Sequence, residues 1–167
     1  MNIANLEQYK RIFNKNYILE TPRKVRIPDR IVTSYKKNGF YNYRMHKLNG
    51  EILGEMQAIP ERVDIPDFYP ETKPYYSFYI KKLESYVRNC GVGKSFMKIA
   101  QKESYKTCCD GKVHLIARNT TNAKDKPDIF YRKCGFDSQN KAHIEIIDEC
   151  ISEGKPIEQS WLQTLMY

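Results

Sequence analysis

The stretch Arg88–Ser95 has the composition of a loop that binds phosphate. It reads RNCGVGKS and lies between a strand-like run and a helix-like run. Two glycines separated by one residue let the backbone curl so that successive N–H groups point at one anion, and the following helix adds the positive end of its dipole. We therefore expect a phosphate-binding loop made of Arg88, Asn89, Cys90, Gly91, Val92, Gly93, Lys94 and Ser95.

A nucleotide P-loop is one interpretation of this loop, because Gly93-Lys94-Ser95 matches the end of the P-loop pattern. The first glycine of that pattern would fall at Arg88, whose side chain would crowd the tight turn. A P-loop enzyme also needs a carboxylate for magnesium after another apolar strand, but the run 113–117 is followed by arginine and asparagine. The sequence therefore argues against an ATP or GTP site.

A second motif lies downstream of the loop, and the elements between the two motifs follow in a definite order. The pattern R-x-x-G-x-G over 88–93 is followed by a helix-like run, the apolar run 113–117, and Y-x-x-x-G-F over 131–136. In this order of motifs, over roughly residues 40–136, the chain resembles the GNAT superfamily of acyl-CoA-dependent N-acyltransferases. The resemblance implies that the loop binds the pyrophosphate of coenzyme A, that acetyl-CoA is the acyl donor, and that no metal is needed.

The resemblance also suggests which groups do the chemistry. It implies that Tyr131 protonates the departing thiolate, and a neutral phenol, with a reference pKa near 10, can donate a proton at pH 7. Acyl transfer also needs a base that takes a proton from the amine. Glu84, four residues before Arg88, is the local candidate, with Glu55 as the second and a water relay as a further alternative.

The rest of the cofactor is expected to contact two further segments. Main-chain groups near Leu83, Ser85 and Val87 would pair with the pantetheine arm as a short extra strand would. The resemblance implies a contact from Asn119 or Asn122 to the pantetheine or adenosine part.

The cysteines and histidines indicate neither a disulfide framework nor a metal site. The five cysteines contain no C-x-x-C pair, and the three histidines are scattered without ligand spacing. Cys90 lies where a helix N-terminus and nearby cations are expected to lower the pKa of a thiol. A variable loop position is the favoured interpretation of Cys90.

The length and hydropathy of the chain indicate how many domains it holds and whether it enters a membrane. At 167 residues it fits one domain, and we expect a single GNAT-like acetyltransferase domain over 1–167. No apolar run approaches the length that crosses a bilayer, and the N-terminus has no apolar signal region. We expect a cytoplasmic protein without a membrane partner.

The formal charge of +8 is concentrated at the start of the chain. Residues 1–47 hold eleven Lys or Arg against three acids, which accounts for the whole excess. A solvated basic surface is the favoured interpretation, but such a segment could also hold an acidic protein, RNA or the 3′-phosphate of coenzyme A. A homodimer is also left open.

Periodicity and turn residues predict an α/β (α+β) fold, a mixed, mostly antiparallel central sheet flanked by helices on both faces, as the resemblance also implies. Asn49-Gly50 indicates a hairpin, and four prolines between 60 and 74 indicate a loop. The expected elements are a helix over 5–17, a short helix or strand over 30–36, strands over 40–48 and 51–59, a loop over 60–74, a strand over 75–85, a helix over 94–105, a strand over 112–117, the helix that carries Tyr131, a helix or strand over 143–150 that stops at Gly154, and a strand over 161–167.

The leading functional hypothesis is an N-acetyltransferase that moves acetyl from acetyl-CoA to a primary amine by direct attack in a ternary complex. The alternative is a coenzyme A-binding or non-catalytic module of the same fold whose basic region binds RNA or an acidic partner. Between them stands an acetyltransferase that acts on aminoacyl-tRNA. The sequence does not identify the acceptor, because a fold-level resemblance fixes the donor better than the substrate.

Overall fold

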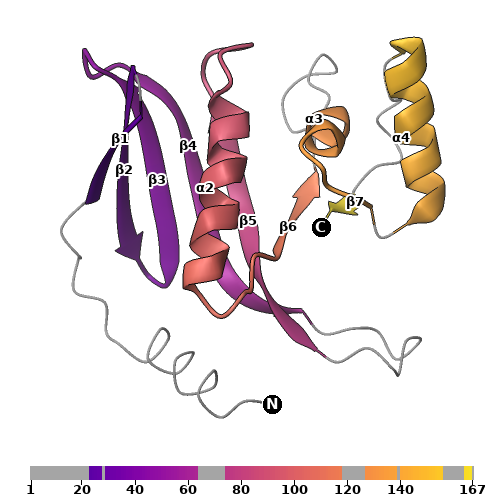
Figure 1. Cartoon of the computed structure of the whole chain (residues 1–167), viewed down its shortest axis with the longest axis horizontal. Coiled ribbons are helices and arrows are strands. Elements are labelled where there is room, and N and C mark those ends of the chain that lie inside the picture. The colour runs from indigo at the N-terminus through magenta and orange to yellow at the C-terminus, as the bar shows by residue number, and fades with distance from the viewer. Residues whose placement is uncertain are drawn as a thin grey trace. The chain divides into compact units, whose positions relative to one another are not determined.

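The computed structural model describes residues 23–27, 29–63, 74–117, 127–138, 140–155 and 164–166 (Figure 1). They belong to two compact units, Met1–Val113 and His114–Tyr167. The predicted helix over 5–17 and the residues Asn119 and Asn122 lie outside the described residues. The prediction of one domain over the whole chain stays a prediction.

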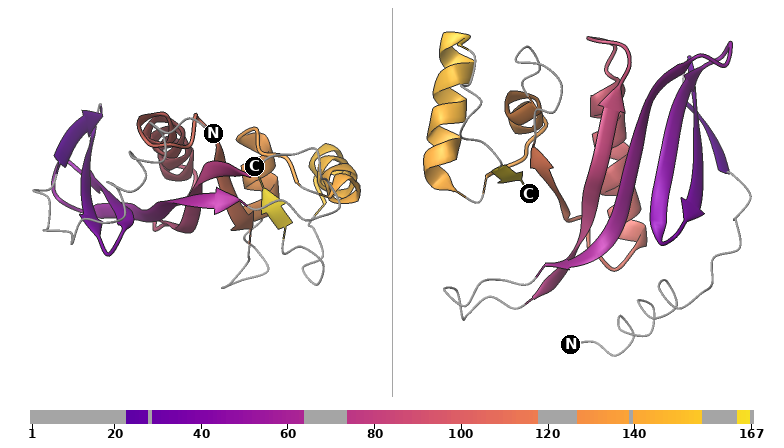
Figure 2. Two further views of the ribbon diagram at one scale, coloured as in Figure 1. Left: turned by 90° about the horizontal axis from the view of Figure 1, so that it is seen from below. Right: turned by 180° about the vertical axis from the view of Figure 1, so that it is seen from behind.

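The first unit contains five strands, and each pairs in antiparallel fashion with its neighbour in the sequence (Figure 2). They are β1 (Arg23–Ile27), β2 (Arg30–Lys37), β3 (Phe40–Lys47), β4 (Ile52–Val63) and β5 (Tyr75–Ser85). The segment expected as a helix or a strand is therefore the strand β2. The described helices and this sheet confirm the predicted mixed α/β class with a mostly antiparallel sheet.

The hairpin predicted from Asn49-Gly50 connects β3 to β4. The Gly50 N–H donates to the Lys47 carbonyl at 3.0 Å, and the Lys47 N–H donates to the Glu51 carbonyl at 2.8 Å. Gly50 has a φ of 91°, which a glycine adopts at little cost. The loop between Lys47 and Glu51 thus has three residues rather than two, with the glycine in the left-handed position after the turn.

The predicted loop over 60–74 is wrong at its start. Residues 60–63 belong to β4 and pair with β5, and Pro60 is fully buried opposite Phe78. On its other side β4 pairs with β3 only as far as Ala58, so Pro60 borders an edge, where a missing N–H is tolerated. Proline therefore did not mark the end of this strand.

The helix α2 (Val92–Lys106) packs on β4 and β5 and completes the core of the first unit (Figure 1). Phe96 and Ala100 on the helix are fully buried, as are Met56 and Phe78 on the strands. Gly54 allows this close approach. A Cβ there would lie 2.4 Å from the Glu84 carbonyl oxygen and 2.9 Å from a methyl group of Val92.

The change Gly54→Ala is expected to lower the free energy of unfolding by about 2 kcal/mol, because the nearest atom is backbone and cannot move aside as a flexible side chain can. Urea unfolding measures this loss. The matched control is Gly154→Ala, where a Cβ meets nothing within 4 Å and only the positive φ adds a cost. A loss at Gly54 no greater than that at Gly154 would contradict the proposed close packing.

The second unit contains β7 (Thr164–Met166) and all but the first residue of β6 (Val113–Ala117), and these two strands are antiparallel. Its helices are α3 (Pro127–Lys133) and α4 (Lys141–Glu153). Asn140 caps α4 by accepting the Ala142 N–H at 3.0 Å, and Gly154 ends it with a φ of 66°. The segment predicted as a helix or a strand is thus a helix, and the predicted stop at Gly154 is confirmed.

The two helices of the second unit are joined by one arginine. Arg132 of α3 donates from Nε and Nη2 to the two carboxylate oxygens of Asp148 on α4, each at 2.8 Å, and it also bonds Asp137. Such a bidentate pair fixes orientation as well as distance. No helix in the described ranges is both long and apolar enough to cross a membrane.

Candidate functional site

The loop between β5 and α2 has the backbone geometry that an anion needs. Asn89 and Gly91 have positive φ angles of 56° and 70°, and α2 begins at the next residue, Val92. No side chain of the described residues caps this helix, and its first backbone bond runs from the Ser95 N–H to the Gly91 carbonyl at 3.0 Å. The N–H groups of the first turn therefore face outward without an intrahelical acceptor.

The change of hand at Gly91 adds to this effect. A left-handed residue followed by a right-handed helix makes successive N–H groups converge on one point, and the helix dipole favours an anion there. A Cβ at Gly91 would meet nothing within 4 Å, so the space beside the turn is open. The helix starts at Val92, which makes Lys94 its third residue rather than its first. Phosphate binding itself stays a prediction.

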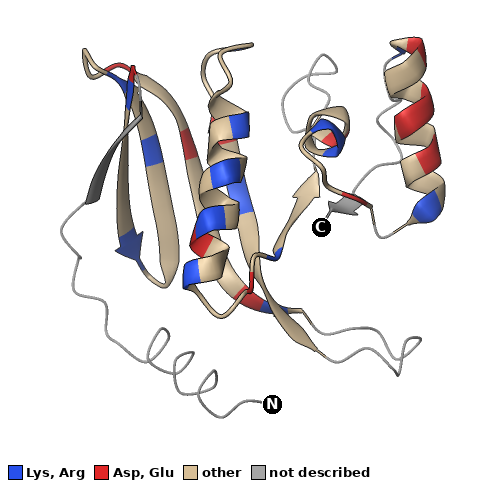
Figure 3. Cartoon of the chain, viewed as in Figure 1, with Lys and Arg blue, Asp and Glu red and all other residues tan. Residues whose placement is uncertain are grey.

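Lysines add positive charge along α2. They recur every four residues on its exposed face, at positions 94, 98, 102 and 106 (Figure 3). Regular spacing by four places them along one side of a helix. This charge raises the local concentration of a polyanion near the loop.

A β-bulge decides which face of the sheet carries Glu84. Lys82 pairs with Gln57 and Ile80 pairs with Ala58, so Lys81 is an extra residue on β5. Without the bulge, Glu84 would share the face of the buried Ile80, because side chains alternate along a strand. With the bulge, it lies opposite Glu55 on the face away from α2.

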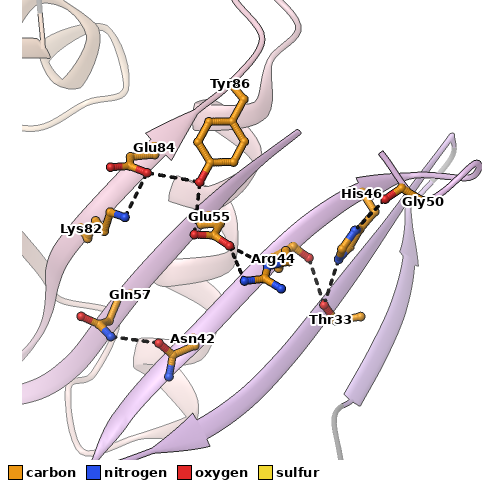
Figure 4. Close-up of polar contacts among 10 residues, drawn as sticks. All are labelled: Thr33, Asn42, Arg44, His46, Gly50, Glu55, Gln57, Lys82, Glu84 and Tyr86. Atoms are coloured by element: carbon orange, nitrogen blue, oxygen red, sulfur yellow. Dashed lines mark hydrogen bonds and ion pairs between the residues drawn. The ribbon is translucent and has the colours of Figure 1, made fainter. Parts of the chain in front are cut away.

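Glu55 and Glu84 form a polar cluster with Tyr86, Arg44 and Lys82 (Figure 4). The Tyr86 hydroxyl lies 3.2 Å from a carboxylate oxygen of each glutamate. Arg44 donates to Glu55 at 2.6 Å, and Lys82 lies 3.0 Å from Glu84. Two like charges directly opposite each other destabilise a sheet, and the two cations and the hydroxyl offset this repulsion.

The two carboxylates of the cluster differ in their surroundings. Burial acts to raise the pKa of Glu55, but the hydrogen bond and charge of Arg44, with help from Tyr86 and Lys82, outweigh it and lower that pKa. Burial and the two glutamates raise the pKa of Tyr86, so its hydroxyl stays protonated. The side chain of Glu84 is 45% exposed, against 27% for Glu55. Glu84 is therefore the carboxylate that an incoming molecule meets more easily.

Tyr131 lies on α3 with only 8% of its surface exposed. Its ring makes edge contacts with Phe130 and Phe136, with centroids 5.1 and 5.9 Å away. Burial, with smaller effects from Cys134 and Asp128, raises the pKa of Tyr131 to about 12. The phenol is thus neutral at pH 7.

The spacing Y-x-x-x-G-F has a structural explanation of its own. The Phe136 N–H donates to the Tyr131 carbonyl at 3.1 Å, and the Gly135 N–H donates to the Arg132 carbonyl at 3.0 Å. With a φ of 95° at Gly135, these bonds form the Schellman ending of a helix, in which the residue after the glycine packs on the residue three from the end. The motif therefore fixes the place of the Tyr131 ring, whatever its chemistry.

Asp128 is a buried carboxyl near Tyr131 in the sequence. Only 7% of its surface is exposed, and its Oδ1 has no hydrogen-bond partner among the described residues. Burial raises its pKa to about 6, although a bond from its own backbone N–H and the charge of His143 act in the opposite direction. An unfolded chain ionises an aspartate near pH 4. Burial of Asp128 therefore does not lower the free energy of unfolding below about pH 4. The destabilisation grows as the pH rises and is complete above about pH 6.

Replacing Asp128 by asparagine is expected to raise the free energy of unfolding by about 1 kcal/mol at pH 8 and to leave it unchanged at pH 4. Urea unfolding at both pH values measures the difference. Glu149→Gln, an exposed carboxylate on α4, is the matched control and should change stability little at either pH. Equal effects of Asp128→Asn at both pH values would rule out this source of pH dependence.

The other sequence-predicted positions are placed only in part. Leu83 and Ser85 pair with Met56 and Gly54 near the end of β5, and the Ser85 hydroxyl donates to the Val87 carbonyl at 2.7 Å. Their pairing with pantetheine stays a prediction. The loop and the glutamates belong to the first unit and Tyr131 to the second. No group of three or more metal-binding side chains occurs in the part of the chain that is described.

Sequence reasoning missed Tyr86, Arg44 and Arg30. Tyr86 and Arg44 join Glu55 only through the register of β3, β4 and β5. Arg30 of β2 donates from Nη2 to the Cys90 carbonyl, across sixty residues of sequence. Nothing local in the sequence signals contacts of this kind, because they depend on strand pairing.

Comparison with known proteins gives similarities in structure. No family model and no curated protein matches the chain. The toxin AtaT, in a mutant form bound to the C-terminus of the antitoxin AtaR and to acetyl-CoA, is 13% identical with a TM-score of 0.47, over 77% of this chain and 66% of that one. The chain thus spans just under two thirds of that toxin.

Two further structures resemble the chain with similar sequence identities and TM-scores. Nourseothricin acetyltransferase is 14% identical with a TM-score of 0.43, over 74% of this chain and 73% of that one. Chaetomium thermophilum Naa20, in complex with a bisubstrate analogue, is 17% identical with a TM-score of 0.41, over 75% of this chain and 62% of that one. At these identities and scores, the similarity does not identify the activity of this chain.

Proposed function

We propose that the chain is an N-acetyltransferase of the GNAT type, which transfers acetyl from acetyl-CoA to a primary amine by direct attack in a ternary complex. The observation that carries the proposal is the 88–95 loop, where a left-handed Gly91 precedes the uncapped N-terminus of α2. This geometry suits a diphosphate. The motif of the loop resembles the coenzyme A signature, and it lacks the first glycine of the nucleotide signature.

The donor would be held by main-chain groups. The N–H groups from Gly91 to Gly93 would bind the pyrophosphate, and the backbone at Leu83 and Ser85 would pair with the pantetheine arm. When bound, acetyl-CoA supplies the thioester that the amine attacks. The open space beside Gly91 fits this role, because a bulky group there would fill the position of the anion.

Among the candidate bases, Glu84 is favoured over Glu55. Arg44 keeps Glu55 ionised and lowers its pKa, which makes it a weak proton acceptor. Glu84 has the more exposed carboxylate and lies on the strand that leads into the loop. We assign Glu84 to accept the amine proton, directly or through water, and Tyr131 to protonate the leaving thiolate.

A thiol-release assay with acetyl-CoA and a panel of amines tests this proposal. The panel includes small polyamines, aminoglycosides, lysine-containing and free N-terminal peptides, and aminoacyl-tRNA. Release with at least one amine, reduced about a hundredfold in Glu84→Gln at pH 7, is the expected result. Glu61→Gln, another glutamate on the same sheet, serves as the control and should keep full activity.

The alternative is a coenzyme A-binding module whose basic N-terminal region holds RNA or an acidic partner. It rests on the charge of residues 1–47, and the side chains of 1–28 lie outside the described residues. Binding of acetyl-CoA without thiol release from any amine would favour this module. Steep salt dependence of binding to labelled tRNA would then mark RNA as its partner.

A further inference from the structure

Arg30, the first residue of β2, contacts the phosphate loop from three strands away. Its Nη2 donates to the carbonyl oxygen of Cys90, and its Nη1 lies 3.9 Å from the sulfur of the fully buried Met45. The guanidinium of Arg30 therefore contacts both a buried side chain of the sheet and the backbone of the loop. It belongs to the basic segment at the start of the chain, where sequence analysis gave no single cation a role.

The contact determines the direction of a neighbouring N–H group. The described residues contain no cis peptide bond, and in a trans peptide the C=O and the following N–H point in opposite directions. By holding the Cys90 carbonyl, Arg30 turns the Gly91 N–H away from itself. Gly91 is the N-cap residue of α2, so its N–H directly precedes those of the first turn of the helix.

The Cys90–Gly91 peptide needs such an external hold. Gly91 has no Cβ, and glycine populates positive and negative φ about equally, so the peptide before it rotates at low cost. Asn89, Cys90 and Gly91 are all exposed, so packing against the core does not hold the turn in place. A guanidinium remains charged at all accessible pH values and offers a rigid, planar set of donors, which suits it to fix a carbonyl.

We propose that Arg30 is a positioning residue of this loop, which orients the Cys90–Gly91 peptide so that the Gly91 N–H faces a bound diphosphate. The inference rests on the proposed function, because it takes the diphosphate of coenzyme A as the ligand. It assigns Arg30 no direct contact with the substrate. Its effect is therefore transmitted through one peptide group.

Calorimetric titration with coenzyme A and with 3′-dephospho-coenzyme A tests the inference. In Arg30→Ala, both affinities should fall by the same factor, about tenfold, because both ligands carry the diphosphate. The unfolding temperature of the ligand-free protein should stay close to that of the wild type. Arg30→Lys keeps the charge but not the planar set of donors. Its affinity for both ligands should lie between those of the wild type and Arg30→Ala.

Lys37→Ala is the matched control, because Lys37 is an exposed cation at the other end of the same strand. It should change both affinities less than about twofold. This comparison separates the peptide contact from a general loss of positive charge.

Three results would overturn the inference. If Arg30→Ala binds both ligands with wild-type affinity, the inference is wrong but the proposed function still stands. If Arg30→Ala loses affinity for coenzyme A but not for 3′-dephospho-coenzyme A, Arg30 contacts the 3′-phosphate instead of positioning the loop. If the wild-type protein binds neither ligand, the proposed function fails, and the role of Arg30 fails with it.

Discussion

Replacing Gly91 by glutamate should weaken acetyl-CoA binding by at least about a hundredfold while the protein stays folded. A Cβ at Gly91 meets nothing within 4 Å, so the new side chain has room and adds mainly the strain of a φ of 70°. Its carboxylate would lie in the concavity where the N–H groups converge. Two unit charges about 4 Å apart repel by about 4 kcal/mol near a protein surface, which exceeds the energy of a hundredfold change. Titration calorimetry measures the loss.

The control for this change is Gly154→Glu. Gly154 has a φ of 66°, and a Cβ there also meets nothing within 4 Å, so the backbone strain and the added charge are matched. It ends α4 in the other unit and should leave acetyl-CoA affinity within about twofold of the wild type. Gly91→Ala separates strain from charge and should have an intermediate effect. A folded Gly91→Glu protein with wild-type affinity would show that the anion binds elsewhere.

The change Tyr131→Phe should lower the turnover of acetyl transfer by about a hundred- to a thousandfold and change the KM for acetyl-CoA little. The phenylalanine ring keeps the contacts with Phe130 and Phe136, so the helix ending that holds the ring is preserved. Only the hydroxyl is lost, and with it the proton for the leaving thiolate. Steady-state rates with a saturating amine measure the effect.

Tyr43→Phe is the matched control for Tyr131→Phe. Tyr43 is also buried, and its hydroxyl has no hydrogen-bond partner in the described part of the protein. Removing that hydroxyl relieves an unsatisfied polar group and should leave turnover unchanged. Full activity of Tyr131→Phe would remove Tyr131 from the reaction and leave it only the structural role at the end of α3.

Much of the fold was predictable because local signals were strong. The strand over 75–85 has the predicted bounds, and α2 differs from its prediction by two residues at its start and one at its end. Alternating polar and apolar residues define the strand, and apolar residues at helical spacing define α2. Gly50 and Gly154, which predicted the hairpin and a helix end, both have positive φ angles at those places.

The parts that sequence analysis missed depend on pairing between strands. Pro60 was expected in a loop, but it lies in β4 beyond the end of its pairing with β3. Glu84 faces Glu55 only because Lys81 is an extra residue in β5, and a one-residue shift in register reverses every side chain after it. The contact of Arg30 with Cys90 follows from strand order in the same way.

The two motifs differ in what they establish. The bonds from Gly135 and Phe136 show that Y-x-x-x-G-F closes a helix, so its occurrence does not by itself assign a proton donor. The R-x-x-G-x-G loop, in contrast, leaves donors at the start of α2 without a side-chain cap. The loop therefore carries more of the functional argument than the tyrosine motif.

We expect the 88–95 loop to bind the diphosphate of coenzyme A rather than a nucleoside triphosphate. Titration of the wild-type chain with acetyl-CoA, in the presence and absence of magnesium ATP, tests it most directly, with Arg88→Glu and Gly91→Glu titrated in parallel. The wild-type chain should bind acetyl-CoA saturably at one site. Excess ATP should displace it poorly, and both variants should lose this binding. Binding of ATP in preference to acetyl-CoA, or acetyl-CoA affinity unchanged in both variants, would contradict it.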